Sequence, residues 1–521
     1  MIMSAPADGT AVVVPTTHGA LRGHWNHGVA RFAGVPFAAP PVGELRFRPP
    51  QPAQSWDGER DASAFGHISP QNPSLMDALF GGESEAWSED CLYLNVWTSE
   101  PAAAASDTGG RPVMVWIHGG GFEMGSGSSP LYHGESFADE GVVLVTVNYR
   151  LGSVGFLELG HLDPAEVGSG NVGMLDQVAA LEWVRDNIAA FGGDPSNVTV
   201  FGESAGAMSI GLLLSMPRAR GLFHKAIAES GAAATARTPA HAAADTAEFM
   251  AAVGLSSVEE LRAASVEQLL AAHAGVASAR ISDPEGVVEK HGSPFAFLSF
   301  RPVADGREVP SDPLGAVAGG AASGVPLLIG TNLEEWKLFA LMTPTVQSED
   351  DLVDRIRVVG GEPLGALDAY RSEYPDADLA AIECAVLTDV VFRIPAVQLA
   401  DAQSPYAPVY QYRFDWRSPA MGGLIGASHA VEIPFVFDLI EDHRLHVLVG
   451  PDAPSSLARA MHESWIAFAR DGVPSAHGLA DWPTVDHDGR PVMLLDTECT
   501  LAMDPEGTTT KFWAANDASR I

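Results

Sequence analysis

A sharp turn between a strand and a helix constrains the fold of this chain more than any other segment. Val198–Phe201 is a short β-branched and apolar run, and Ala205–Met216 continues as an apolar helix of small residues. Between them stands Gly202-Glu203-Ser204-Ala205-Gly206, whose flanking glycines allow a tight turn without Cβ clashes. Such a turn holds a serine hydroxyl out beyond the end of a strand, as a candidate nucleophile. The five-residue pattern is weak by itself, so other segments must support it.

Further apolar runs place this turn in an alternating order of strands and helices. Val113–Ile117 and Val142–Val147 are continuous apolar runs, typical of strands buried on both faces. Within Gly173–Ala190, apolar residues recur every three or four positions, which predicts an amphipathic helix ending at Gly192-Gly193. Strand, strand, long helix, strand, turn and helix is the order of a doubly wound sheet. We therefore predict an α/β fold with a mostly parallel, twisted sheet and helices on both faces.

The chain is predicted to form a single α/β domain over residues 1–521, although its length alone would suggest about three domains. From about 232 to 300 the sequence becomes Ala-rich and contains Glu, which predicts a helical insertion over the sheet. Val325–Ile329 then resumes the strand pattern, and Ala458–Arg470 predicts a late helix. The Pro-rich stretch Gly34–Pro50 is expected to be extended and to cross the surface.

The charge of the chain disfavours polyanionic partners. It carries 66 acidic and 30 basic residues, a formal net charge of −36. Such a surface repels nucleic acid phosphates and anionic membranes, so neither is expected as a partner. No run approaches the roughly 20 apolar residues that cross a membrane. The sequence leaves the oligomeric state open between monomer and dimer.

Cysteine usage and the N-terminal segment favour a cytoplasmic location. Cys91, Cys384 and Cys499 are widely spaced, and they form neither a disulfide framework nor a zinc-type C-x-x-C pair. Residues 1–17 lack the basic region followed by an apolar region that marks a signal peptide. We expect no metal and no cofactor.

A glycine-rich segment directly after Ile117 is a candidate oxyanion hole. In His118-Gly119-Gly120-Gly121-Phe122, backbone N–H groups can point at a substrate oxygen without a side chain in the way. Gly120 and Gly121 are the expected donors, with the Ala205 N–H as the third. The positive end of the helix that begins at Ala205 would add to this potential. The alternative is a flexible loop at the end of a strand.

A candidate acid and a candidate base follow the serine in the expected order. Gly330-Thr331-Asn332-Leu333-Glu334-Glu335 places two carboxylates just after a predicted strand, where the sites of α/β proteins collect. Gly426–Phe435 places His429 in a loop of small residues. Serine, acid and histidine in this order are typical of one group of serine hydrolases. A lone loop histidine is more often solvated than catalytic, so the residues alone leave that alternative open.

Several segments together resemble the type-B carboxylesterases, the α/β-hydrolase group that includes bacterial para-nitrobenzyl esterases, mammalian carboxylesterases and cholinesterases. Ser88–Val96 looks like the second signature of this family, and Val198–Gly206 looks like its active-serine signature. Gly34–Phe47, Gly170–Gln177 and Trp465–Pro474 are also similar. The resemblance implies an α/β-hydrolase fold with helical insertions over the active site. It also implies cofactor-independent hydrolysis of small-molecule carboxylic esters through an acyl-enzyme.

The resemblance also assigns roles to particular residues. It implies that Ser204 is the nucleophile, His429 the general base and Glu335 the orienting acid, with neighbouring Glu334 as the competitor for that position. It further implies that Glu203 and Ser230 support the site without reacting.

Other family positions are structural. Arg46 and Asp90 match positions that usually hold structural ion pairs. The cysteine equivalent to Cys91 is bridged in secreted relatives to one in a Cys-Pro-Gln segment, which reads Ser69-Pro70-Gln71 here. Cys91 is therefore expected to be a buried free thiol.

Two other functional classes were weighed against an esterase. An interfacial lipase of the same fold would need a large exposed apolar rim. A non-catalytic, neuroligin-like binding protein would have lost members of the triad, which this chain keeps. Gly168–Gly173 fits a dinucleotide pattern but follows a polar loop instead of a strand, and the His-x-x-His pairs at His24 and His443 lack a third metal ligand.

Overall fold

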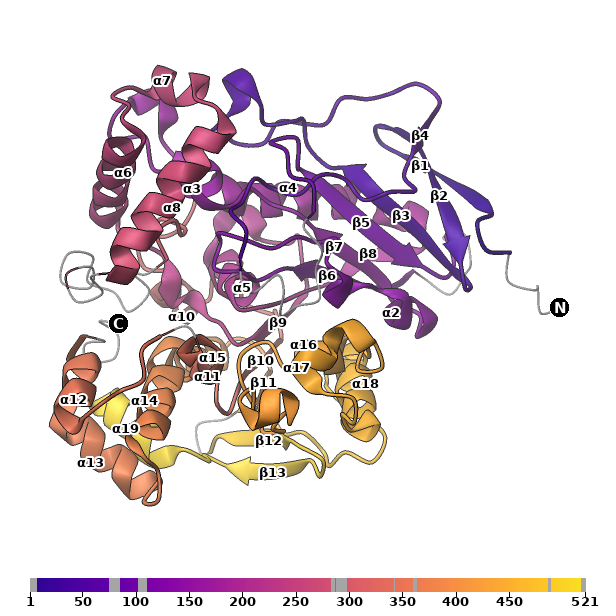
Figure 1. Cartoon of the computed structure of the whole chain (residues 1–521). Helices are drawn as coiled ribbons and strands as arrows, with labels where there is room; N and C mark the ends of the chain where they lie inside the picture. The colour runs from indigo at the N-terminus through magenta and orange to yellow at the C-terminus, as the bar shows by residue number, and fades with distance from the viewer. Residues whose placement is uncertain are drawn as a thin grey trace.

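One mixed sheet organises the molecule (Figure 1). The computed structural model describes residues 7–74, 85–101, 110–282, 286, 298–341, 343–358, 363–485 and 489–516. Within these residues the sheet has 13 strands in the order β1-β2-β3-β5-β7-β6-β8-β9-β10-β11-β12-β13, with β4 paired to β2. All neighbours from β7 to β12 are parallel. The neighbours from β1 to β7 and the pair β12–β13 are antiparallel, and β4 pairs with β2 in parallel. The predicted mostly parallel α/β sheet is confirmed.

The strands are β1 (Ala11–Thr16), β2 (Gly19–Asn26), β3 (Val29–Pro36), β4 (Glu59–Asp61), β5 (Tyr93–Thr98), β6 (Arg111–Ile117), β7 (Val143–Val147), β8 (Gly193–Glu203), β9 (Lys225–Glu229), β10 (Leu327–Asn332), β11 (Val409–Phe414), β12 (Pro491–Leu495) and β13 (Thr500–Met503). The α-helices are α2 (Glu135–Asp139), α3 (Gly152–Phe156), α4 (Val172–Asn187), α5 (Ala205–Ser215), α6 (Pro239–Val253), α7 (Val258–Ala263), α8 (Val266–Ser282), α10 (Pro313–Ala318), α11 (Trp336–Ala340), α12 (Glu349–Val358), α13 (Pro363–Glu373), α14 (Leu379–Thr388), α15 (Ile394–Gln403), α16 (Ile433–Val436), α17 (His446–Val449), α18 (Ser455–Asp471) and α19 (Gly507–Ala515).

The central strands bury both faces in two separate apolar cores. Successive side chains of a strand point to opposite faces. In β6, Val115 therefore joins the core that contains α4, α5 and α15, whereas Trp116 joins the core that contains α2, α16 and α18. Because both faces are covered, the strand reads as a continuous apolar run in the sequence.

The elements predicted around the turn at Ser204 are confirmed. The run Val113–Ile117 lies in β6, and Val142–Val147 contains β7. The amphipathic helix is α4, and the turn joins β8 to α5. The predicted strand after residue 325 is β10, and the late helix is α18.

The prediction that Gly34–Pro50 is extended and crosses the surface holds only for part of the stretch. The stretch begins inside β3 and contains a 3-10 turn at Gly43–Leu45. Phe37 and Phe47 belong to the same core as α4, although Pro40, Val42–Glu44 and Pro49 are exposed. The antiparallel N-terminal strands β1 to β3 were not predicted at all.

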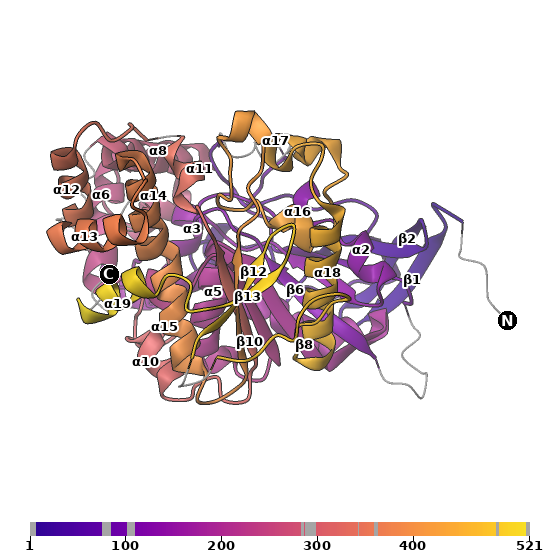
Figure 2. The ribbon, with the colours of Figure 1, turned by 90° about the horizontal axis from the view of Figure 1, so that it is seen from below.

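Two groups of helices lie on the side of the molecule opposite β1 and β2, in both views (Figures 1 and 2). The first is α6, α7 and α8, within the segment 232–300 that the composition predicted to be helical. The second is α12, α13, α14 and α19, which share a third core around Tyr370 and Trp513. Among the described residues, none of the helices is long and apolar enough to cross a membrane.

Candidate active site

Ser204 stands at a strained turn between β8 and α5. Its φ of 56° and ψ of −122° lie outside the regions that serine commonly adopts. The surrounding structure holds this conformation, since the Ser204 N–H donates to the Glu229 carbonyl at 2.9 Å and its carbonyl accepts from Met208 N–H at 2.8 Å. Glu203 and Ala205 on either side are buried, but Ser204 is partly exposed. The turn thus presents the hydroxyl outside the core.

The two flanking glycines are required by a close approach to β6. A Cβ on Gly206 would lie 1.9 Å from the Ile117 carbonyl oxygen, and one on Gly202 would lie 2.4 Å from the same atom. Neither glycine has a positive φ, so packing and not backbone freedom explains both. The turn can lie against β6 only without side chains at these positions.

The candidate oxyanion loop runs beside this turn. A Cβ on Gly119 would lie 3.1 Å from the Ser204 Cβ, so the bare backbone of the loop passes the nucleophile. Gly120 and Gly121 have φ values of 103° and 64°, which glycine adopts freely. Among the described residues neither amide donates to a backbone carbonyl. Their N–H groups are therefore available to a substrate oxygen.

His118 supports the start of this loop and is uncharged. Its ring stacks on Tyr149 with 4.5 Å between centroids, and its Nδ1 lies 2.8 Å from the Gly119 carbonyl. Burial lowers the pKa of His118 to about 4, so the ring is neutral at neutral pH. The Tyr149 hydroxyl also donates to the His118 carbonyl at 2.9 Å.

The structure brings Glu335 and His429 together. The Nδ1 of His429 lies 2.7 Å from Glu335 Oε2, across 94 residues of sequence. The other carboxylate oxygen of Glu335 accepts the Asn332 N–H at 2.7 Å, and the backbone N–H of His429 donates to the Glu335 carbonyl at 3.3 Å. Glu335 is fully buried and His429 is 5% exposed, so the pair is shielded from water.

Glu334, the competing acid, lies in different surroundings. Its carboxylate accepts the Ala427 N–H at 3.0 Å and lies 3.3 Å from Lys337 and from Arg417. Although burial opposes its ionisation, the amide and the two cations lower the pKa of Glu334. Glu334 therefore fixes the loop before His429, and Glu335 contacts the imidazole.

The second ring nitrogen of His429 faces Glu203, the residue before Ser204. Nε2 lies 3.0 Å from Glu203 Oε1, but neither atom has a well-aligned hydrogen bond within the described residues. Burial, and then the charge of Glu335, raise the pKa of Glu203 well above its ordinary value. The raised pKa of Glu203 favours its neutral form beside the ring.

Ser230, predicted to support the site, belongs to a buried polar group that includes a residue the sequence did not single out. Its hydroxyl donates to Glu432 Oε1 at 3.3 Å, and the other oxygen of Glu432 accepts from the side chain of Asn332. Burial, together with Glu203 and Glu335, raises the pKa of Glu432 to about 8. In the sequence, only its position three residues after His429 could have pointed to Glu432 as part of the site.

Three aromatic rings near His429 were also missed. Phe392 and Phe339 lie with their ring centroids 4.7 and 5.1 Å from that of His429, and Trp336 lies 5.0 Å from Phe339. Phe392 is on a π-helical turn, Asp389–Arg393, between α14 and α15. Trp336 and Phe339 could have been suspected from their position just after Glu335. Nothing in the sequence points to Phe392.

Arg46 holds a structural ion pair, as its match to the family implied. It forms a bidentate pair with Glu89 at 2.6 Å. Cys91 is fully buried and free, as predicted, and it hydrogen bonds to Ser69.

No group of three histidine, cysteine or acidic side chains in the described part of the chain could hold a metal ion.

Comparisons with known proteins agree with this geometry. A model of the carboxylesterase family matches residues 10–513. A para-nitrobenzyl esterase of Bacillus subtilis is 43% identical over 95% of this chain and 97% of its own. A phenmedipham hydrolase of Pseudarthrobacter oxydans is 35% identical over 94% of this chain and 96% of its own.

Solved structures give the same result. A Geobacillus stearothermophilus carboxylesterase superposes with a TM-score of 0.85 at 40% identity, covering 96% of this chain and 99% of that chain. A para-nitrobenzyl esterase superposes with a TM-score of 0.81 at 40% identity, covering 96% and 100%. These neighbours confirm the predicted α/β-hydrolase fold.

Proposed function

Because the chain belongs to the carboxylesterase family and is a carboxylic ester hydrolase, we propose that Ser204, Glu335 and His429 form its catalytic triad. The observation that carries this proposal is the contact of 2.7 Å between the His429 ring and the buried Glu335. Glu335 fixes the tautomer with the proton on Nδ1, so Nε2 is left as the base. The unpaired Nε2 then accepts the proton of the Ser204 hydroxyl as that oxygen attacks the ester carbonyl.

The amide N–H groups of Gly120, Gly121 and Ala205 stabilise the negative charge that develops on the carbonyl oxygen. Removing one such donor typically costs about 3 kcal/mol of barrier. The N-terminus of α5 at Ala205 adds positive potential at the same place. Because these donors are fixed by the backbone, they need no reorganisation during the reaction.

The second half of the cycle uses the same groups. His429 gives its proton to the departing alcohol, and the acyl group remains on Ser204. Water then attacks the acyl-enzyme with His429 as base again.

We propose that the substrates are small esters with an aromatic alcohol. The alcohol oxygen must lie beside Nε2 to receive the proton, and so the alcohol group lies near the partly exposed rings of Trp336 and Phe339. A para-nitrobenzyl ester has such an alcohol, and the 43% identical relative is named for that substrate.

The free thiol of Cys91 is compatible with the cytoplasm as the proposed location.

Ser204→Ala tests the proposal. We expect it to remove turnover of p-nitrophenyl and p-nitrobenzyl esters, by about 10³-fold or more, while the circular dichroism spectrum and Tm stay unchanged. An organophosphonate should label the natural protein at Ser204 and not the variant. Turnover by Ser204→Ala at the natural rate would refute the assignment, and a natural protein that is not labelled would favour a non-catalytic binding role.

A further inference from the structure

The loop that presents the oxyanion-hole amides carries a carboxylate that the proposed mechanism does not use. Glu123 lies two residues after Gly121. Its Oε1 accepts the Ser299 N–H at 2.9 Å and lies 3.2 Å from Nε2 of His273 on α8. The side chains of Glu123 and His273 are 17% and 7% exposed. The loop is thus joined to the segment 232–300 through a nearly buried polar contact.

This contact is made by a charged carboxylate. Burial alone would raise the pKa of Glu123, but the His273 ring and the Ser299 and Phe300 amides together outweigh it and lower the pKa. Hydrogen bonds to an ionised acceptor are stronger than those between neutral groups. The His273 ring is itself held edge-on against Phe300, with 4.8 Å between centroids.

The loop has a backbone that needs such support. Phe122 has a φ of 63°, in the left-handed region that favours glycine. Its carbonyl accepts the Gly152 N–H at 2.7 Å, and its ring packs against Phe156 at 5.3 Å. These contacts hold the loop from the side of α3. Glu123, the next residue, holds it from the side of α8.

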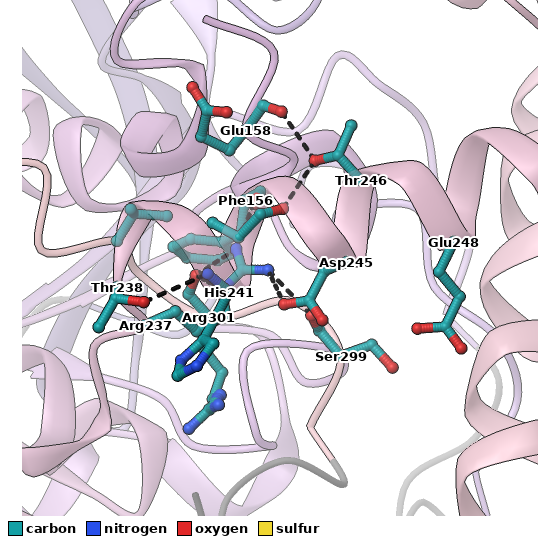
Figure 3. A network of polar contacts seen from close by, with 12 residues as sticks. Phe156, Glu158, Arg237, Thr238, His241, Asp245, Thr246, Glu248, Ser299 and Arg301 are labelled. Carbon is teal, nitrogen blue, oxygen red and sulfur yellow. Dashed lines mark hydrogen bonds and ion pairs between the residues drawn. The ribbon is translucent and has the colours of Figure 1, made fainter. Parts of the chain in front are cut away.

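Ser299, whose N–H binds Glu123, also belongs to a larger buried network. Figure 3 shows that network around Arg237 and Asp245. The Ser299 carbonyl accepts from Arg237 at 3.1 Å, and Arg237 also pairs with Asp245 of α6 at 2.6 Å. The same guanidinium donates to the Phe156 carbonyl at 2.7 Å. Ser299 is therefore fixed on its carbonyl side by the network and on its amide side by Glu123.

The neighbour of Ser299 reaches the oxyanion hole itself. A Cβ on Gly121 would lie 2.9 Å from Cδ2 of Leu298, so the leucine side chain covers this glycine. The hydrogen bond from Ser299 to Glu123 therefore links the donor loop to the side chain that packs on it.

We propose that Glu123 and His273 are positioning residues, which fasten the segment 232–300 to the oxyanion loop and thereby set the direction of the Gly120 and Gly121 amides. The inference rests on the proposed function, because it assigns those amides to the transition state. It makes α8 part of the machinery that stabilises charge, and not only a cover over the sheet.

Glu123→Gln and His273→Gln test the proposal from both sides of the contact. In each variant we expect kcat for p-nitrophenyl acetate to fall about tenfold with KM within about twofold, because misdirected donors weaken only transition-state binding. The double variant should lose no more than the larger single loss, since both residues act through one contact. Glu123→Asp, which keeps the charge, should recover part of kcat.

Glu166→Gln is the matched control. Glu166 is buried and lies 2.5 Å from Arg262 of α7, so it joins the same segment to the body of the protein away from the oxyanion loop. Its kcat should stay at the natural value, even if its Tm falls as much as that of Glu123→Gln.

Natural kcat in both Glu123→Gln and His273→Gln would overturn the proposal, as would a loss no larger than that of Glu166→Gln. Such a result with an inactive Ser204→Ala would leave the triad assignment standing. An active Ser204→Ala would instead show that the proposed function had failed.

Discussion

The two sides of the candidate site are built by different means. The side that contains Ser204 and the Gly119–Gly121 loop is made by backbone conformation, with positive φ values and glycines pressed against β6. The side that contains Glu335 and His429 is made by contacts between side chains from segments 94 residues apart. The first side is encoded locally, and the second depends on the complete fold.

This difference determines how each side should fail when it is altered. A change on the backbone side disturbs packing between β6, β8 and α5, so stability should fall together with activity. A change on the side-chain side should remove a proton-transfer partner and leave the fold intact. The following four predictions test this contrast.

Replacement of the acid should have the largest effect. Glu335→Gln keeps the shape of the side chain but not the charge, and we expect kcat to fall by roughly 10³- to 10⁴-fold with an unchanged Tm, because the imidazolium loses its partner and the tautomer is no longer fixed. The readout is steady-state turnover of a p-nitrophenyl ester. Glu334→Gln is the control, with an expected loss of about tenfold at most. Equal losses in the two variants would contradict the assignment of the acid.

Replacement of a flanking glycine should affect folding. Gly206→Ala would place a Cβ 1.9 Å from the Ile117 carbonyl oxygen, so β8 or α5 must shift. We expect a loss of about 3 kcal/mol in the free energy of unfolding, measured by urea denaturation. Gly275→Ala in α8 is the control, because a Cβ there meets nothing within 4 Å. If Gly206→Ala had natural stability, the close approach of the turn to β6 would be disproved.

Glu432 should make stability depend on pH. Its pKa is raised from 4.5 to about 8 in the folded chain. Above 4.5 the unfolded chain releases the proton while the folded chain retains it, so this contribution to stability is lost as the pH rises toward about 8, by up to ~1.4 kcal/mol per pH unit. In Glu432→Gln the decline of Tm between about pH 5 and about pH 8 should be shallower than in the natural protein. Parallel Tm curves would argue against a retained proton.

Changes in substrate specificity should be the smallest effects. Residues on the Ser204 side should affect selectivity for the acyl group, and residues on the His429 side should affect selectivity for the alcohol. Leu298 lies against Gly121 of the oxyanion loop, so Leu298→Ala should improve kcat/KM for longer acyl chains by a few-fold relative to acetate. Phe339 lies by His429, so Phe339→Leu should change selectivity for the alcohol by a similar few-fold factor. Two ester series, varied separately in acyl and alcohol groups, measure both. If Leu298→Ala altered only the preference for the alcohol, the assignment of the acyl group to the oxyanion-loop side would be wrong.

Much of the backbone side could be predicted from the sequence. Gly202–Gly206 between a β-branched run and an apolar helix specifies the turn, because strand, turn and helix are each set by nearby residues. The glycines after Ile117 follow from the same local logic. The central strands were visible for another local reason, since burial on both faces leaves an uninterrupted apolar run.

The side-chain contacts could not be predicted in the same way. The sequence named no partner for Arg46, and the packed fold pairs it with Glu89, 43 residues away. Phe392 reaches His429 from a π-helical turn, and Glu123 contacts His273 of α8, which is distant in the sequence. No spacing in the sequence encodes these contacts. The resemblance to a family favoured Glu335 over Glu334 as the acid, whereas the residues alone left both possible.

The order of the strands β8, β9, β10 and β11 across the sheet has a consequence for biosynthesis. These strands are neighbours in the sheet in the same order as in the sequence, which is the order of their synthesis. The segments that follow their carboxyl ends contain successive residues of the site. The Ser204 turn needs the Glu229 carbonyl of β9 to hold its conformation, and the imidazole arrives only after β11. A nascent chain therefore carries Ser204 without its base until His429 has been made, so the serine can react only after β11 has been added.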